Sequence, residues 1–222
     1  MLDETGKPAR LTWTYSRDEM VADAVVHLIG GLFALGAAIS LVILCIFWAS
    51  APQFAGVMTY VVSLIAALGA SAAYNMWPIS RTKWLLRRFD HAAIFVLIAG
   101  TYTPFLILLP SGLLAGLTLL VIWLAAAAGI ALKVFLPGQF DRLSIGLYLA
   151  LGWSGTLIAG SVWHAVPPAA VWLVAIGGGL YSAGVIFHVW RTLKFQNAIW
   201  HGFVLAAAAC HFAAVVVSVT GR

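Results

Sequence analysis

The sequence predicts an all-α membrane protein, a bundle of seven transmembrane helices with a cytoplasmic N-terminus and a C-terminus outside. Two observations predict this fold class. First, 63% of the 222 residues are hydrophobic and only 9% are charged, with a mean hydropathy of +1.02. Such a chain has too few charges to cover a water-facing surface. Second, the apolar residues fall into seven runs, each long enough to cross a hydrocarbon core of about 30 Å.

Short polar or proline-containing joints separate the apolar runs, and helix breakers at joints support this division. Residues 1–20 form a charged segment that we expect in the cytoplasm, and residues 21–222 form the transmembrane domain. No small-residue cleavage pattern closes the first run, so we expect it to remain as the first span. The expected spans are approximately residues 21–49, 53–75, 91–109, 113–135, 143–162, 168–190 and 199–220.

The lysines and arginines gather at the N-terminus and at the second, fourth and sixth joints. Of the 12 basic residues, all but Arg222 lie there. By the positive-inside rule this side is cytoplasmic. The net charge of +5 therefore reflects topology and contact with lipid headgroups. It gives no reason to expect nucleic-acid binding, so membrane lipids are the expected partners.

Polar and ionisable residues inside membrane spans are costly, so their positions point to function. Glu19, Asp23 and His27 are spaced by four residues and share one face of the first helix. Other polar residues lie where the second span ends and where the third and seventh begin: Ser71, Asn75, Asp90, His91, Asn197 and His201. The alternating topology places all of these residues near the cytoplasmic end of the bundle.

A structural role is the alternative for each of these residues. Asp90 and Asn197 are candidates for the N-caps of helices, and Asn, Ser and His commonly form hydrogen bonds between membrane helices. However, polar pairs spaced by four residues occur on different helices at the same depth. Separate structural roles explain such a set less well than they explain single residues. His211 lies ten residues beyond His201, about 15 Å deeper at a rise of 1.5 Å per residue. We expect it to be packed and hydrogen-bonded.

The chain resembles the hemolysin III proteins in four segments that occur in the family's order and spacing: EMVADAVVHLIGG, SAAYN, RRFDHAAIFVLIAGTYTPF and NAIWHGFVLAAAACHF. The resemblance covers nearly the whole chain. Hemolysin III proteins are similar to the progestin and adiponectin receptors and, more distantly, to the alkaline ceramidases. The resemblance implies a seven-helix membrane fold with the N-terminus inside, in agreement with the charges. We expect the protein in the bacterial cytoplasmic (inner) membrane.

The resemblance also implies a zinc site. In the family this site resembles Ser-x-x-x-His at the end of the second span, an Asp at the start of the third, and His-x-x-x-His at the start of the seventh. Ser71 and Asp90 match this pattern, and His201 matches the second histidine of the last pair. Asn75 and Asn197 occupy the other two histidine positions. Of the three histidine ligands in this pattern, His201 is therefore the only one present in this sequence.

The two asparagines argue against zinc at these positions. Zinc favours nitrogen and sulfur donors and usually takes three protein ligands at a catalytic site, whereas an amide oxygen suits calcium or hydrogen bonding. We therefore expect a metal-free or weakly metal-binding site, in which Asn75, Asn197, His201 and Asp90 form a bracing hydrogen-bond network. His201 would be a residual ligand or proton carrier.

Other polar residues are expected around this site. They are Glu19, Asp23, His27, His91 and His211. Neighbouring side chains could also supply replacement metal ligands, which would restore a zinc site. The candidates for that role are Asp23, His27, His91 and His188.

The function that we favour is a lipid-binding or signalling membrane protein that holds a lipid between its helices. Small residues let membrane helices approach closely. Glycines that would allow close packing or a cavity occur in the sixth span: Gly177, Gly178, Gly179 and Gly184.

Two alternatives belong to other functional classes. The first is an enzyme, a zinc-dependent lipid-amide hydrolase of the ceramidase type, in which Asp90 or Ser71 positions a metal-activated water. The second is an ion or proton transporter, or a pore with cytolytic activity. Its path would use Glu19, Asp23, His27 and Asp90.

Overall fold

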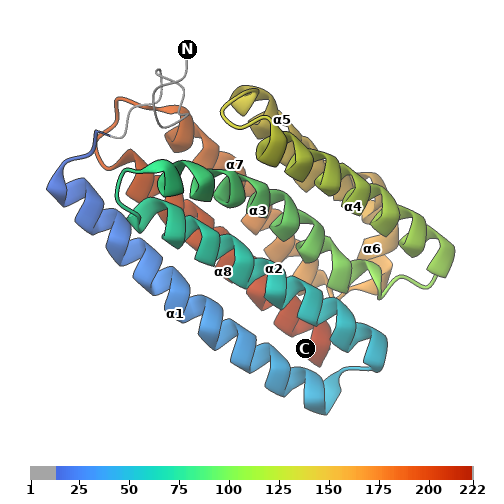
Figure 1. The fold of residues 1–222 in the computed structure, drawn as a ribbon. Helices are drawn as coiled ribbons and strands as arrows, with labels where there is room; N and C mark the ends of the chain where they lie inside the picture. The colour runs from blue at the N-terminus through green and yellow to red at the C-terminus, as the bar shows by residue number, and fades with distance from the viewer. Residues whose placement is uncertain (1–13, 222) are drawn as a thin grey trace.

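The computed structural model describes residues 14–221 as a bundle of membrane-length helices (Figure 1). Residues 1–13 of the expected cytoplasmic segment lie outside the described residues. Seven helices are long and apolar enough to cross a membrane, and residues 14–221 contain no strand. These findings confirm the predicted fold class.

Six of the spans are single helices, and the fifth is broken. The unbroken spans are α1 (Arg17–Trp48), α2 (Ala51–Met76), α3 (Arg81–Leu106), α4 (Gly112–Phe135), α7 (Pro168–Val189) and α8 (Gln196–Thr220). The fifth span consists of α5 (Asp141–Trp153), the 3₁₀ turn η1 (Ser154–Ile158) and α6 (Ala159–Ala165).

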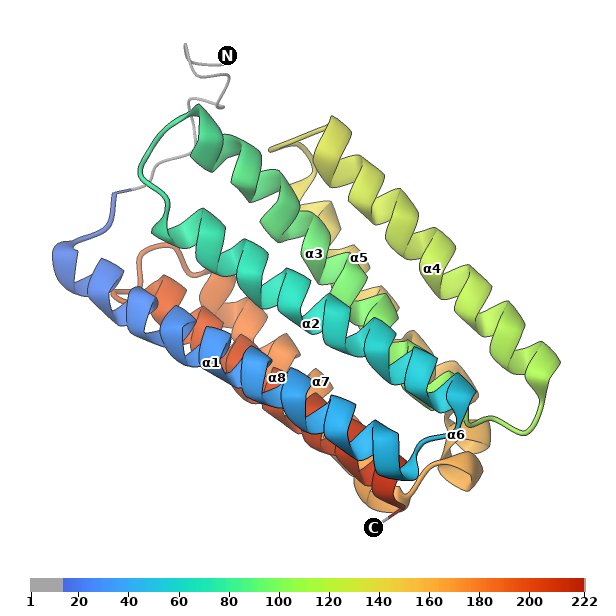
Figure 2. The ribbon, with the colours of Figure 1, turned by 60° about the horizontal axis from the view of Figure 1, so that its bottom comes forward.

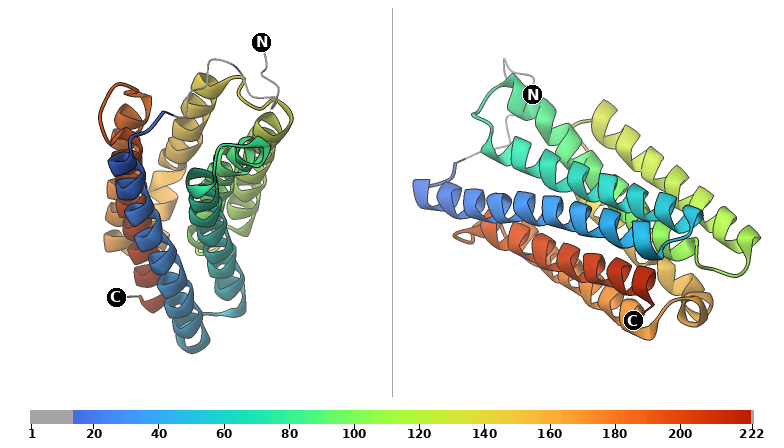
Figure 3. Two further views of the ribbon diagram at one scale, coloured as in Figure 1. Left: turned by 60° about the vertical axis from the view of Figure 1, so that its left-hand side comes forward. Right: turned by 90° about the horizontal axis from the view of Figure 1, so that it is seen from below.

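The helices run up and down the bundle and close into a ring. α2 packs on α3, α3 on α4, and α7 on α8, while α1 contacts both α2 and α8 (Figure 2). α5 contacts α3, α4 and α7 more lightly and completes the ring on the far side (Figure 3). The first and last spans are thus neighbours, although they are separated by almost the whole chain.

The start of α3 differs from the expected span, which began at about residue 91. The helix begins at Arg81, because Ser80 caps it by accepting a hydrogen bond from the Lys83 backbone N–H. Asp90 therefore lies inside α3 and is not its N-cap. Asn197 is not an N-cap either, because Phe195 holds that position in α8.

Two of the basic residues at the start of α3, Lys83 and Arg87, are buried and bind specific partners. Lys83 is 7% exposed, and its Nζ donates to the carbonyls of Tyr74, Asn75 and Trp77 at 2.9, 3.1 and 2.9 Å. The last carbonyls of a helix lack partners within the helix and carry its negative dipole end. Lys83 therefore caps α2 and fixes the segment that carries Asn75.

A buried ion network joins α3, α4 and α5 at the same end. The Asp141 carboxylate accepts from Arg87 at 2.9 Å and from Lys133 at 2.8 Å. Arg87 and Lys133 are almost fully buried. A buried charge is tolerated only with a close, well-oriented partner, so this network sets the position at which α5 begins.

Glycines permit two close helix contacts in the bundle. A Cβ atom at Gly129 of α4 would collide with the ring of Phe95, and one at Gly177 of α7 would collide with the ring of His211. Small residues of this kind let membrane helices approach closely. The close packing expected for the glycines of the sixth span is thus present at Gly177.

The break in the fifth span is bridged by Tyr102 of α3. The Tyr102 hydroxyl donates to the Gly152 carbonyl at 2.8 Å and accepts from the Gly155 N–H at 2.7 Å. Backbone polar groups inside a membrane have no water to bind. Tyr102 therefore supplies the hydrogen bonds that the interrupted helix lacks.

We predict that Tyr102→Phe lowers the free energy of unfolding by about 1–3 kcal/mol, because it leaves backbone groups of the fifth span without partners. Thermal unfolding in detergent would measure this. The matched control is Tyr60→Phe, which removes a buried hydroxyl that has no hydrogen-bond partner among residues 14–221. An equal loss of stability in both variants would contradict the bridging role of Tyr102.

One end of the bundle, which we call the basic end, holds the start of α1 and the joints α2–α3, α4–α5 and α7–α8. Every lysine and arginine among residues 14–221 lies at or near this end. We predict that a green fluorescent protein fused to the N-terminus fluoresces in bacterial cells, whereas the same protein fused to the C-terminus does not. An alkaline phosphatase fusion should show the reverse pattern, and the opposite outcome would invert the predicted orientation.

Candidate functional site

A cluster of polar side chains lies inside the basic end, where α1, α2 and α8 meet. We call it the polar cluster. Its members are Asp23, His27, Ser71, Asn75 and His201. Asp23 is 5% exposed. A carboxylate at such a depth needs a charged or hydrogen-bonding partner, and the histidines provide it.

Asp23 organises both imidazole rings of the cluster. Its Oδ1 lies 2.6 Å from Nδ1 of His201 and 3.6 Å from Nδ1 of His27. The same His27 nitrogen is 2.8 Å from the backbone oxygen of Asp23. Both acceptors are oxygens, so Nδ1 carries the proton in each ring. The ring centroids are 4.4 Å apart, with the rings edge to face.

The Nε2 atoms of both rings face Ser71. The Ser71 Oγ lies 3.2 Å from Nε2 of His27 and 3.5 Å from Nε2 of His201. Asn75 donates from Nδ2 to the Ser71 backbone oxygen at 2.9 Å, and the same nitrogen is 3.5 Å from Nε2 of His27. Asn75 thus braces α2 and approaches the ring of His27.

A small cavity borders this side of the rings. Its volume is about 20 Å³, which is enough for one water-sized particle. The residues that line it are Val26, His27, Gly30, Leu68, Ser71, His201, Val204 and Leu205. The two imidazoles and the Ser71 hydroxyl are its polar wall.

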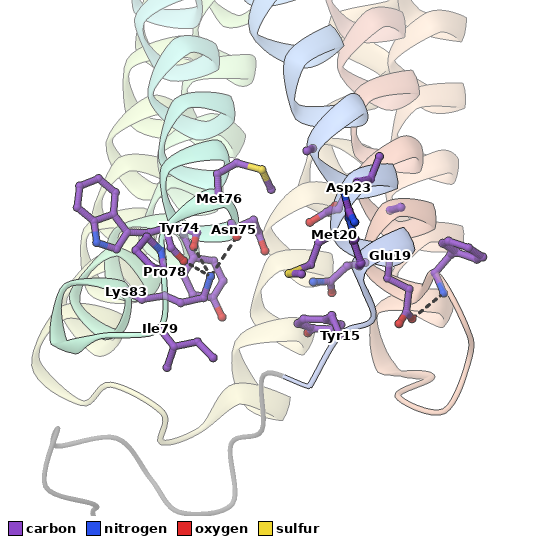
Figure 4. Close-up of a pocket in the computed structure, with 17 residues that line it drawn as sticks. Tyr15, Glu19, Met20, Asp23, Tyr74, Asn75, Met76, Pro78, Ile79 and Lys83 are labelled. Carbon is purple, nitrogen blue, oxygen red and sulfur yellow. Dashed lines mark hydrogen bonds between the residues drawn. The ribbon is translucent and has the colours of Figure 1, made fainter.

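A larger cavity of about 440 Å³ lies beside the polar cluster at the basic end. Figure 4 shows side chains at the start of α1 facing those of the α2–α3 joint across it. Asp23 and Asn75 line this cavity and also belong to the polar cluster. The other residues that line it are Tyr15, Arg17, Glu19, Met20, Val21, Ala24, Tyr74, Met76, Trp77, Pro78, Ile79, Lys83, Phe195, Asn197 and Ala198.

The remaining family positions lie next to the cluster. Asn197 lines the large cavity close to the Tyr15 hydroxyl. Burial raises the pKa of Tyr15, so this hydroxyl stays protonated and can donate a hydrogen bond. Asp90 is half-buried and lies close to Ser71 and His201.

Glu19 has a different set of partners from the cluster. It accepts hydrogen bonds from the backbone N–H groups of Ser16 at 2.9 Å and Phe195 at 3.0 Å. The first bond completes a capping box at the start of α1. The second ties α1 to the α7–α8 joint, so Glu19 closes one side of the large cavity.

The other candidate histidines lie outside the polar cluster. His91 lies near Arg87 and Asp141, on the side of α3 that faces α5. His211 lies deeper, where its Nε2 donates to the Val174 carbonyl at 3.2 Å. His188 packs against the Trp200 ring, with a centroid distance of 4.9 Å.

Sequence reasoning missed Lys83 and Tyr15 as residues of this region. The prediction placed Lys83 in a polar joint. The serine before the RTKWLLRR stretch and the buried Trp84 within that stretch are nevertheless typical of a capped amphipathic helix. Tyr15 precedes the capping serine of α1, and that position alone does not predict its burial.

Comparison with known proteins gives the family. The family described as Haemolysin-III related matches residues 15–212. The chain belongs to the hemolysin III family. Together with the seven apolar helices, this membership makes it an integral membrane protein.

Three hemolysin III relatives show the extent of the similarity. The chain is 36% identical over 198 residues to the hemolysin-3 homolog of Bacillus subtilis (strain 168), covering 89% of this chain and 93% of that protein. It is 34% identical over 212 residues to hemolysin-3 of Bacillus cereus, covering 96% of each. It is 33% identical over 127 residues to the monocyte to macrophage differentiation factor of Homo sapiens, covering 57% of this chain and 52% of that protein. No solved structure matches the chain.

The side chains at the zinc positions that the resemblance implies do not fit a zinc ion. Asn75 and Asn197 supply amides where imidazoles are required, and the Asn75 amide nitrogen is used to brace Ser71. Another set of residues has donor atoms suited to a metal ion. Asp23, His27 and His201 each offer one ligand atom, and these atoms lie within 4.8 Å of one another.

We predict that Asp23→Asn lowers the free energy of unfolding by about 2 kcal/mol, because the charge-assisted hydrogen bond to His201 is lost. Thermal unfolding with a chelator present would measure this effect without metal. The control is Asp18→Asn, an exposed acid on the same helix, with an expected change of less than about 1 kcal/mol. Equal changes in the two variants would contradict a stabilising hydrogen bond between Asp23 and His201.

Proposed function

We propose that this hemolysin III protein binds a membrane lipid whose headgroup enters the large cavity at the basic end. The observation that carries the proposal is this cavity of about 440 Å³, which has both apolar and polar walls. Ligand sites in proteins are typically concave, with apolar walls and a few polar groups that fix orientation. The positive-inside rule places the basic end among the headgroups of the cytoplasmic leaflet.

The charges around the cavity favour a zwitterionic headgroup. Two acidic side chains, Glu19 and Asp23, and two basic ones, Arg17 and Lys83, line the cavity. Because these charges balance, a headgroup with both an ammonium and a phosphate is matched better than a purely anionic one. Phosphatidylethanolamine has this chemistry.

The uncharged walls suit the rest of a lipid. Apolar side chains line the cavity from three segments, namely Met20, Val21, Met76, Trp77, Ile79 and Phe195. Their surfaces can cover the glycerol and the first part of an acyl chain, where burial of each CH₂ group contributes about 0.8 kcal/mol. Tyr15 and Asn197 add hydrogen-bonding groups for the headgroup.

We predict that the purified protein retains about one phosphatidylethanolamine through a detergent wash, as measured by native mass spectrometry. Ala24→Trp and Ala198→Trp each place an indole at the cavity wall and should reduce the retained lipid at least about tenfold. Ala127→Trp is the matched control, because Ala127 is exposed on α4.

The comparison with phosphatidylglycerol tests the headgroup. Preferential retention of phosphatidylethanolamine supports the charge argument, whereas equal retention of both lipids would reject it. Equal retention by the control and both cavity variants would place the lipid on the outer surface of the bundle and overturn the proposal.

A metal-dependent lipid-amide hydrolase is a second candidate, favoured by one observation. The Asp23, His27 and His201 groups lie beside the large cavity, with Asp23 in its wall. A bound zinc ion would supply Lewis acidity and an activated water. Release of fatty acid from ceramide by the purified protein, lost in His27→Gln and kept in Ala127→Trp, would favour the hydrolase over simple lipid binding.

A further inference from the structure

We propose that Asp23, His27 and His201 form a substitute metal site, in which α1 supplies the ligands that are missing from α2 and α8. The expected ion is a divalent transition metal such as zinc. The site differs from the family pattern, of which only His201 is retained. It does not depend on lipid binding in the large cavity.

The donor set suits such an ion. One carboxylate and two imidazoles are typical ligands of zinc sites that keep a fourth position open for water. The three ligand atoms lie within 4.8 Å of one another before any ion is present. Ligands 2.0–2.2 Å from a tetrahedral ion are on the order of 3.4 Å apart, so only small side-chain movements are needed.

The hydrogen bonds around the two rings have the pattern of a metal site. The Asp23 carboxylate lies beside Nδ1 of both histidines, with its Oδ1 2.6 Å from His201 and 3.6 Å from His27. An ion bound by these three atoms would take the place of the proton on each Nδ1. The Ser71 hydroxyl, which lies near both Nε2 atoms, would then orient the rings from their other side.

The carboxylate also supplies charge and access for an ion. Asp23 contributes a negative charge, which favours a cation at a buried position, and it lines the large cavity of about 440 Å³. The cluster therefore combines donors, charge and access.

The positions of Asp23 and His27 explain how they can replace the missing histidines. Nε2 of His27 lies 3.5 Å from the Asn75 side chain, so an imidazole from α1 stands where the family has one on α2. Asp23 and Asn197 line the same large cavity, so a carboxylate from α1 borders the space at the other altered position. One turn of α1 thus compensates for both asparagines.

The test is the metal content of purified, full-length protein that has been exposed to zinc and dialysed. We expect about one zinc ion per chain in the natural protein and in the control His164→Gln, which removes an exposed histidine at the opposite end. His27→Gln and Asp23→Asn should weaken zinc binding by at least about tenfold. Cobalt substitution provides a second measurement, because a cobalt ion bound by these ligands absorbs visible light.

A rescue variant separates loss of ligands from loss of folding. In the His27→Gln background, Asn75→His and Asn197→His restore the family's histidine positions. This triple variant should regain zinc, which a misfolded protein would not do. A natural protein that holds no more zinc than the His27→Gln variant would overturn the proposal, and so would undiminished binding in both His27→Gln and Asp23→Asn.

Discussion

A membrane interior offers no water to a backbone, so each peptide group in this chain must find its partner within the protein. Most groups find it inside a helix, and side chains meet several of the exceptions. Serines accept from the first turns of α1, α3 and α4. Lys83 donates to the last carbonyls of α2, and Tyr102 bridges the interruption of the fifth span. The joints and ends that surround the cavities are fixed by these bonds.

The closed ring of helices determines where the chemistry of the protein lies. Because α1 packs beside both α2 and α8, the first turns of α1 face the end of α2 and the start of α8. Asp23 and His201 meet there across 178 positions in the sequence. The polar cluster is therefore a product of tertiary packing, and the large cavity adjoins it. Binding of a lipid and binding of a metal would use adjoining parts of one end of the bundle.

Hydropathy and charge predicted the spans well, because a hydrocarbon solvent imposes length and composition directly. The family positions Ser71, Asp90 and His201 also lie together, next to Asn75. Other features depend on packing that a sequence does not specify. The spacing of Asp23 and His27 predicted a shared face of α1, but the rotation that turns this face towards His201 comes from contacts with α2 and α8. The early start of α3 was missed because its first turns are rich in lysine and arginine, which is the composition of a joint. Asp90 and His91 are adjacent in sequence yet face different helices, since successive residues point about 100° apart.

The broken fifth span has a consequence for how the protein is made. Its first piece, α5, has 13 residues and extends about 20 Å, which is shorter than a hydrocarbon core of about 30 Å. Neither α5 nor the shorter α6 can cross a bilayer alone, and the turn between them needs the hydroxyl of a residue on the third span. During synthesis the third span leaves the ribosome first. It can therefore act as a template inside the membrane, and the fifth span becomes a stable crossing when it reaches this earlier helix.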